Sequence, residues 1–112
     1  MNKRKPPAPP HLSDISRRWW HAVTAEYALE PHHIHLLRLA CEALDRAEEA
    51  RQALATNGTT YLDRFNAPRL RPEVAIERDS RLAFARLCRE LDLGTTEAVS
   101  RTAPPPLRSN RG

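Results

Sequence analysis

The segment from Pro31 to Gly58 constrains the fold more than any other part of the chain. Proline suits the first turn of a helix because its missing N–H has no helical partner there, and Asn57 followed by Gly58 is a C-terminal stop signal. One apolar stripe with helical spacing consists of Ile34, Leu37, Cys41, Leu44 and Leu54, and a small-residue flank consists of Leu36, Ala40, Ala43, Ala47 and Ala50. Such a helix is about 39 Å long, too long for so small a core, so its outer part should meet another helix or another subunit.

Two further helices are predicted on either side of this segment. The first begins with Ser13 or Asp14 as its N-cap, and its apolar face consists of Ile15, Trp19, Val23 and Tyr27. The other begins at Pro72 and ends at Gly94. Its buried stripe consists of Ile76, Ala83, Phe84, Leu87 and Leu91, and arginines occupy the opposite side. Because Glu77 and Arg81 have the i, i+4 spacing, this arginine side fits a solvated face with compensated charges better than a phosphate-binding ridge.

Residues 58–72 differ in character from the helices. Thr59, Thr60, Tyr61 and Leu62 have strand propensity, Asn66 suits a turn, and Pro68 weakens a returning strand. This segment predicts a short, irregular hairpin. The expected fold class is therefore mainly α: a three-helix core with a long central helix, a short irregular β-hairpin, and flexible basic, proline-rich arms at both ends.

The ends of the chain carry most of its ten prolines and little apolar periodicity. We therefore interpret residues 1–11 as a disordered or extended basic, proline-rich arm and residues 103–112 as a proline/arginine tail. Residues 12–102 remain as a helical core and oligomerisation domain. A core of this size buries a modest fraction of its surface, so self-association is expected.

The chain carries a net charge of +4, which favours a polyanionic partner. The excess positive charge lies in residues 1–30, 58–72 and 95–112, whereas the two longer helical segments are nearly balanced. Arginine suits phosphate recognition, because its planar fork matches phosphate oxygens. Basic tails that only keep the chain soluble are the alternative interpretation.

Residue patterns that carry chemistry are scarce. His32, His33 and His35 begin the central helix, but no acidic residue completes an HExxH arrangement and neither cysteine is near in sequence, so we expect no metal site. The three glycines are too widely spaced for a phosphate-binding loop, and no Ser, His and Asp arrangement stands out. We expect no catalytic residues and no cofactor. Cys41 and Cys88 fit reduced core residues of an intracellular protein, and neither a signal peptide nor a membrane span is expected.

Residues 86–101 (RLCRELDLGTTEAVSR) resemble a helix-turn-helix, in which the second helix enters the major groove. The turn is one residue longer than usual, and Pro104 limits the second helix to about two turns. A short C-terminal helix that packs back on the core through Val99 fits the same residues. The sequence leaves both interpretations open. A small helix-turn-helix transcriptional regulator is one alternative function, and an adaptor that contacts only protein is another.

The order of elements resembles that of the small terminase subunit of tailed bacteriophages, cos-phage type. The matching features are Leu12 to Trp20, Leu39 to the helix end at Gly58, the Thr59, Thr60 and Tyr61 run, Pro72 to Leu87, and Leu91, Leu93 and Arg101. The chain departs from the family pattern at Arg71, Asp92, Gly94 and Thr95. The resemblance covers about residues 12–101.

The resemblance implies a DNA-packaging function. Small terminase subunits are non-catalytic, assemble into rings of more than two subunits, bind double-stranded viral DNA at the packaging start site, and recruit or regulate the large ATPase/nuclease subunit in the host cell cytoplasm. Because flexible or irregular basic segments suit phosphate contact, we expect the DNA to be held mostly electrostatically. The residues expected to bind DNA are Lys3, Arg4, Lys5, Arg17, Arg18, Arg64, Arg69, Arg71 and Arg101.

Overall fold

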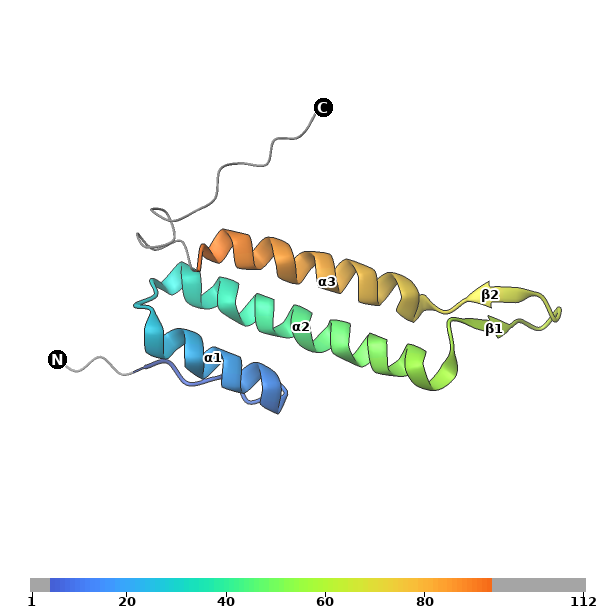
Figure 1. The fold of residues 1–112 in the computed structure, drawn as a ribbon, viewed down its shortest axis with the longest axis horizontal. Helices are drawn as coiled ribbons and strands as arrows, with labels where there is room; N and C mark the ends of the chain where they lie inside the picture. Colours follow the sequence, from blue (N-terminus) through green and yellow to red (C-terminus); the bar gives the residue numbers. More distant parts are fainter. Residues whose placement is uncertain (1–4, 94–112) are drawn as a thin grey trace, which may run out of the picture.

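A computed structural model of the chain describes residues 5–93. Three helices and one hairpin follow one another in these residues (Figure 1): α1 (Asp14–Glu26), α2 (Pro31–Asn57), β1 (Thr60–Leu62), β2 (Pro68–Leu70) and α3 (Pro72–Leu91). The mainly helical fold, with its long central helix and short hairpin, confirms the predicted fold class.

Helix α2 has the bounds that its terminal residues predict. Pro31 occupies its first turn, and the backbone N–H of Glu30 just before it donates to Nδ1 of His33 at 3.2 Å. At the other end, the N–H of Gly58 donates to the carbonyl of Leu54 at 2.8 Å. Gly58 has a φ of 84° and a ψ of 176°, a conformation that is essentially restricted to glycine. The chain can therefore turn directly from α2 into β1.

Helix α2 lies between the other two helices, and both run antiparallel to it (Figure 1). Helix α3 packs along it from the hairpin to the opposite end. Helix α1 covers only the first half of α2, because α1 begins beside Asp45 and ends near the start of α2. The molecule therefore has a three-helix end and a two-helix end, and the hairpin extends from the two-helix end.

The hydrophobic core lies at the three-helix end. Its buried side chains are Leu12, Trp20, Val23, Leu37, Ala40, Cys41 and Leu91. All three helices contribute to this cluster, and Leu37 and Cys41 are fully buried at its centre. Burial of Cys41 raises the pKa of its thiol to about 12. The thiol is therefore neutral at physiological pH, as expected for a reduced core cysteine.

The buried face of α1 differs from the predicted one. The helix buries Ser16, Trp20, Val23 and Thr24, so Val23 is buried as predicted, and the predicted Trp19 and Tyr27 pack against the core while partly buried. Ile15 is 61% exposed. Ser16 can be buried because its hydroxyl donates to Oδ1 of Asp45 at 2.6 Å, and the Thr24 hydroxyl donates to the carbonyl of Trp20 at 3.0 Å. The prediction was therefore wrong for Ile15, and it missed Ser16 and Thr24, which can be buried because their hydroxyl groups have hydrogen-bond partners inside the protein.

Residues 5–12 lie along α1 without forming a helix or strand. The indole Nε1 of Trp20 donates to the carbonyl of Pro6 at 2.9 Å, and Nζ of Lys5 donates to the carbonyl of Thr24 at 2.9 Å. Leu12 belongs to the core, and Ala8 packs against it. Part of the proline-rich arm that we expected from the sequence therefore forms fixed contacts with the helical core.

Helix α3 ends at Leu91, three residues before the predicted stop at Gly94. Asp92 takes the left-handed conformation that often ends a helix, with a φ of 61°. Leu91 is buried, and Phe84 and Leu87 pack against the core as predicted. The earlier part of the predicted stripe is wrong, because Ile76 is 39% exposed and Ala83 is also exposed. Helix α1 does not extend far enough to cover the start of α3.

Candidate nucleic-acid interface

The structure separates the predicted DNA-binding residues into two groups. Lys5, Arg17 and Arg18 lie on or beside α1, whereas Arg64, Arg69 and Arg71 belong to the hairpin or follow it directly. Because the hairpin extends past the two-helix end, a single copy of the chain does not bring these groups together (Figure 1). Lys3, Arg4 and Arg101 lie outside the described residues.

The hairpin turn is built around the carboxylate of Asp63. Its Oδ1 accepts hydrogen bonds from the backbone N–H groups of Phe65 at 2.8 Å and Ala67 at 3.0 Å, and its Oδ2 accepts one from Nε of Arg69 at 2.8 Å. The hydrogen bond from Ala67 and the one from Arg69 lower the pKa of this carboxyl group. Asn66 takes a left-handed conformation, with a φ of 66°. These bonds fix both the turn and the Arg69 side chain.

Two hairpin arginines lie over aromatic rings. The guanidinium carbon of Arg64 is 5.1 Å from the ring centre of Phe65, and that of Arg71 is 5.7 Å from the ring centre of Tyr61. In the described residues, neither arginine forms an ion pair, and Nε of Arg71 is buried without a hydrogen-bond partner. Cation–π stacking orients a guanidinium group without neutralising it. The hairpin therefore presents positive charge that no described carboxylate compensates at Arg64 and Arg71.

The two faces of the hairpin differ in polarity. The strands pair antiparallel, with Thr60 opposite Leu70, Tyr61 opposite Arg69 and Leu62 opposite Pro68. Because side chains alternate between the faces of a strand, Tyr61 and Arg69 lie on one face and Leu62 and Leu70 on the other. The basic residues of the hairpin were predicted from the sequence, but its apolar face was not. Alternation in the two short strands is the signal that could have identified it.

The basic residues near α1 are arranged differently. Nη2 of Arg17 forms an ion pair with Asp14 at 3.0 Å, and its Nη1 donates to the carbonyl of Pro10 at 3.4 Å. Arg18 is exposed and forms no ion pair within residues 5–93. Lys5 retains an exposed side chain although its Nζ contacts the Thr24 carbonyl. This end of the molecule thus offers exposed positive charge on a fixed helix.

The order of these elements matches a known family. A family model described as "Phage terminase, small subunit" matches residues 16–105, which include most of α1 and all of α2, the hairpin and α3. The chain belongs to the phage terminase small-subunit family. This match confirms the resemblance inferred from the sequence. No curated protein and no solved structure matches the chain.

In this terminase small-subunit family member, Arg78 and Arg81 of α3 and His33 at the start of α2 have other structural roles. Arg81 forms an ion pair with Glu77 at 3.5 Å and Arg78 forms one with Asp79 at 3.1 Å, so charges on this part of α3 are compensated. His33 caps α2, and no group of three possible metal ligands occurs within residues 5–93. No helix in the same range is long and apolar enough to cross a membrane.

The predicted helix-turn-helix lies only partly within the described residues. Residues 86–91 form the last turns of α3, and residues 94–101 lie outside the described range. The first helix of the motif is therefore the end of a 20-residue helix that packs on α2. Whether residues 86–101 read bases stays a prediction.

Proposed function

We propose that this chain is the non-catalytic DNA-recognition subunit of a phage genome-packaging terminase. In this proposal it assembles into a homo-oligomer of more than two copies, binds double-stranded viral DNA at the packaging start site, and recruits or regulates the large subunit in the host cell cytoplasm. The observation that carries the proposal is the family match, which spans the helices and the hairpin together.

The distribution of basic residues supports DNA contact by an assembly. A single copy holds uncompensated positive charge at two separated places: exposed Arg18 on α1, and half-buried Arg71 beside the hairpin. Several copies together repeat these charges along a surface long enough to follow a duplex. Release of condensed counterions from the DNA backbone then supplies much of the binding free energy.

Salt-dependent titrations test the DNA-binding part of the proposal. Replacement of Arg18 or Arg71 by Gln should weaken binding to a packaging-site fragment and to a scrambled fragment alike. Each lost phosphate contact should also lower the slope of log affinity against log salt by about 0.9. Arg78→Gln is the matched control, because Arg78 already has a carboxylate partner on α3. Unchanged affinity and slope in both Arg18→Gln and Arg71→Gln would contradict this assignment of the DNA surface.

Charge substitution is a better probe of the N-terminal segment than deletion. Removal of residues 1–11 also removes the Pro6 carbonyl that binds Trp20 and the contacts of Ala8 with the core. We therefore expect Lys3→Gln combined with Arg4→Gln to weaken binding to both fragments while the unfolding midpoint stays unchanged. Equal affinity before and after this substitution would assign the two residues a solubilising role.

The oligomeric state tests the rest of the proposal. Native mass spectrometry should show a homo-oligomer larger than a dimer at micromolar concentration. A dimer that binds a palindromic DNA site would instead support the transcriptional-regulator alternative. A chain that stays monomeric, with or without DNA, would contradict the ring.

A further inference from the structure

The apolar face of the hairpin lacks a cover in the described chain. Leu62 is 62% exposed and Leu70 is 65% exposed, and both lie on the face opposite Tyr61 and Arg69. A two-stranded hairpin with three-residue strands is marginally stable by itself, because it needs an apolar face packed against another element. Leu62 and Leu70 are diagonal neighbours on this face, because Leu62 pairs with Pro68 and Leu70 pairs with Thr60. Contiguous exposed apolar surface marks an interaction site.

The helices of the same copy leave this face open. The hairpin extends past the ends of α2 and α3, with its turn farthest from both helices (Figure 1). All three residues of each strand are exposed. Within residues 5–93, no part of the same copy therefore covers Leu62 and Leu70.

A groove at the middle of α2 offers a matching surface. It lies where α1 begins, and its volume is about 290 Å³. Ile15, which is 61% exposed, and Leu44 supply its apolar part. The carboxylates of Asp45, Glu48 and Glu49 also line it, and that of Glu48 forms an ion pair with Arg51 at 2.6 Å. In the part of the chain that the structure describes, Glu49 takes part in no ion pair. This α1–α2 groove is therefore apolar and acidic, whereas the hairpin is apolar and basic.

We propose that the apolar face of the hairpin in one copy of the chain docks into the α1–α2 groove of the next copy. The proposal rests on the oligomeric function proposed above and names the surfaces that build the oligomer. Leu62 and Leu70 would cover Ile15 and Leu44, and Arg64 at the hairpin turn would approach the groove carboxylates. Opposite charges around an apolar centre fix the register of such a contact.

The two surfaces lie at different places on the chain, so the contact is heterologous. Each copy then offers one free hairpin and one free groove, and copies continue to add until the rotation between neighbours closes a ring. The Tyr61 and Arg69 face stays outside the contact because it lies on the other side of the hairpin. In this proposal, assembly uses the Leu62 and Leu70 face together with Arg64, and DNA contact by the hairpin region is left to Arg71, which lies over the Tyr61 ring.

Matched double variants separate the two faces. Leu62→Thr with Leu70→Thr removes the apolar contact, and Tyr61→Thr with Arg69→Thr changes the opposite face at the same two strands. Threonine retains strand propensity, and in both variants Asp63 still accepts the backbone hydrogen bonds from Phe65 and Ala67 that hold the turn, so both variants keep the hairpin. We expect the first variant to weaken self-association at least about a hundredfold, and the second to retain the oligomer, in native mass spectrometry and sedimentation velocity. Circular dichroism checks that both variants keep the helical content.

A mixing experiment tests the heterologous geometry. Ile15→Arg places a cation in the groove, and because Ile15 is exposed, the substitution leaves the core intact. Alone, this variant and the Leu62→Thr/Leu70→Thr variant should both be monomeric. Mixed, they should form a 1:1 dimer, because one retains an intact hairpin and the other an intact groove. Absence of the mixed dimer, or full oligomers of either variant alone, would overturn the proposed contact.

These measurements also distinguish the inference from the function on which it rests. An unsubstituted chain that is monomeric at micromolar concentration contradicts the proposed oligomer itself. An unsubstituted chain that assembles, together with a Leu62→Thr/Leu70→Thr variant that assembles equally well, overturns only the hairpin contact. DNA titrations on the same samples report the DNA-binding part of the proposal separately.

Discussion

The two ends of the helical body differ in how many side chains they bury. At the three-helix end, α1, the first half of α2 and the last half of α3 enclose the core around Leu37. At the two-helix end, Ala50 is the buried side chain, and Ile76 on α3 is 39% exposed. The same 27-residue helix therefore serves two purposes. Its first half holds the fold together, and its second half carries the hairpin away from the core.

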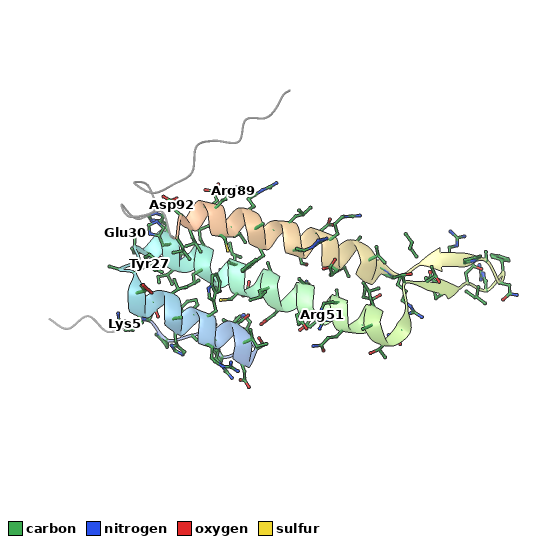
Figure 2. All side chains as sticks on the ribbon, in the orientation of Figure 1. Lys5, Tyr27, Glu30, Arg51, Arg89 and Asp92 are labelled. Carbon is green, nitrogen blue, oxygen red and sulfur yellow. The ribbon has the colours of Figure 1, made fainter. Side chains whose placement is uncertain are left out.

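This difference shows why α2 is longer than its own core requires. A helix that only stabilised this fold could end where α1 begins, near Asp45. The additional turns bury little area within one copy, so their stabilisation comes from α3 alone or from contacts with another molecule. Figure 2 shows side chains such as that of Arg51 projecting from this part of α2 into solvent.

The largest expected loss in the free energy of unfolding follows a substitution at the three-helix end. Leu37→Ala removes a fully buried side chain, so the free energy of unfolding should fall by about 2–5 kcal/mol. Ile76→Ala at the two-helix end should cost less than about 1.5 kcal/mol, because Ile76 is already partly exposed. Urea unfolding at a fixed protein concentration measures both. Equal losses of unfolding free energy in the two variants would show that the two ends stabilise the fold equally.

A smaller effect is expected where α2 meets the hairpin. Gly58→Ala should cost about 1–3 kcal/mol, because the φ of 84° strains any residue with a Cβ atom. Steric overlap adds nothing, since no described atom lies within 4 Å of the added carbon. We expect faster hydrogen exchange at the hairpin amides, while amides around Leu37 keep their protection. Asn66→Gly is the control, because glycine accepts the positive φ found there. Uniformly faster exchange throughout the chain would show that the two ends unfold together.

The smallest expected effect concerns acid stability at the three-helix end. Burial raises the pKa of Asp45, but hydrogen bonds from Ser13 and Ser16 lower it more, so the pKa lies below its ordinary value of 3.8. A lowered folded-state pKa stabilises the protein above pH 3.8, and this stabilisation is lost as the pH falls through the lowered value. Asp45→Asn should therefore cost about 1–2 kcal/mol at pH 7 and much less at pH 2.

Unfolding free energies at the two pH values check this expectation. Glu42 also has a lowered pKa, since hydrogen bonds from His11 and Arg38 outweigh the effect of its burial, so the Asp45→Asn variant keeps part of the acid dependence. Glu49→Gln is the control, because Glu49 lies on the same helix without an ion pair in the described residues. A pH-independent loss would assign Asp45 a packing role.

The element boundaries were largely predictable because local residues determine them. Pro31 and Gly58 fixed both ends of α2, Ser13 is the N-cap of α1, and Pro72 begins α3. The predicted end of α3 was wrong because aspartate can also take the left-handed conformation, and Asp92 does so before Gly94 is reached. Local chemistry thus predicts where a helix starts better than where it stops.

Burial was less predictable because it depends on partners that are distant in sequence. Ser16 is buried because Asp45, 29 residues away, accepts its hydroxyl hydrogen. Trp20 is buried together with the segment that contains Pro6, although hydropathy gives no sign of that contact. For the candidate DNA interface, the sequence identified the basic residues, but only the fold shows that Arg18 and Arg71 lie at different ends.

The second half of α2 and the hairpin form an arm that projects from the core, so a small change of angle at the core displaces the hairpin turn. Together they reach about 35 Å from the point where α1 begins. A tilt of about 10° at the core therefore moves the hairpin turn by about 6 Å. Small changes in side-chain size around Leu37 and Ala40 are thus amplified at the far end, where neighbouring copies would meet.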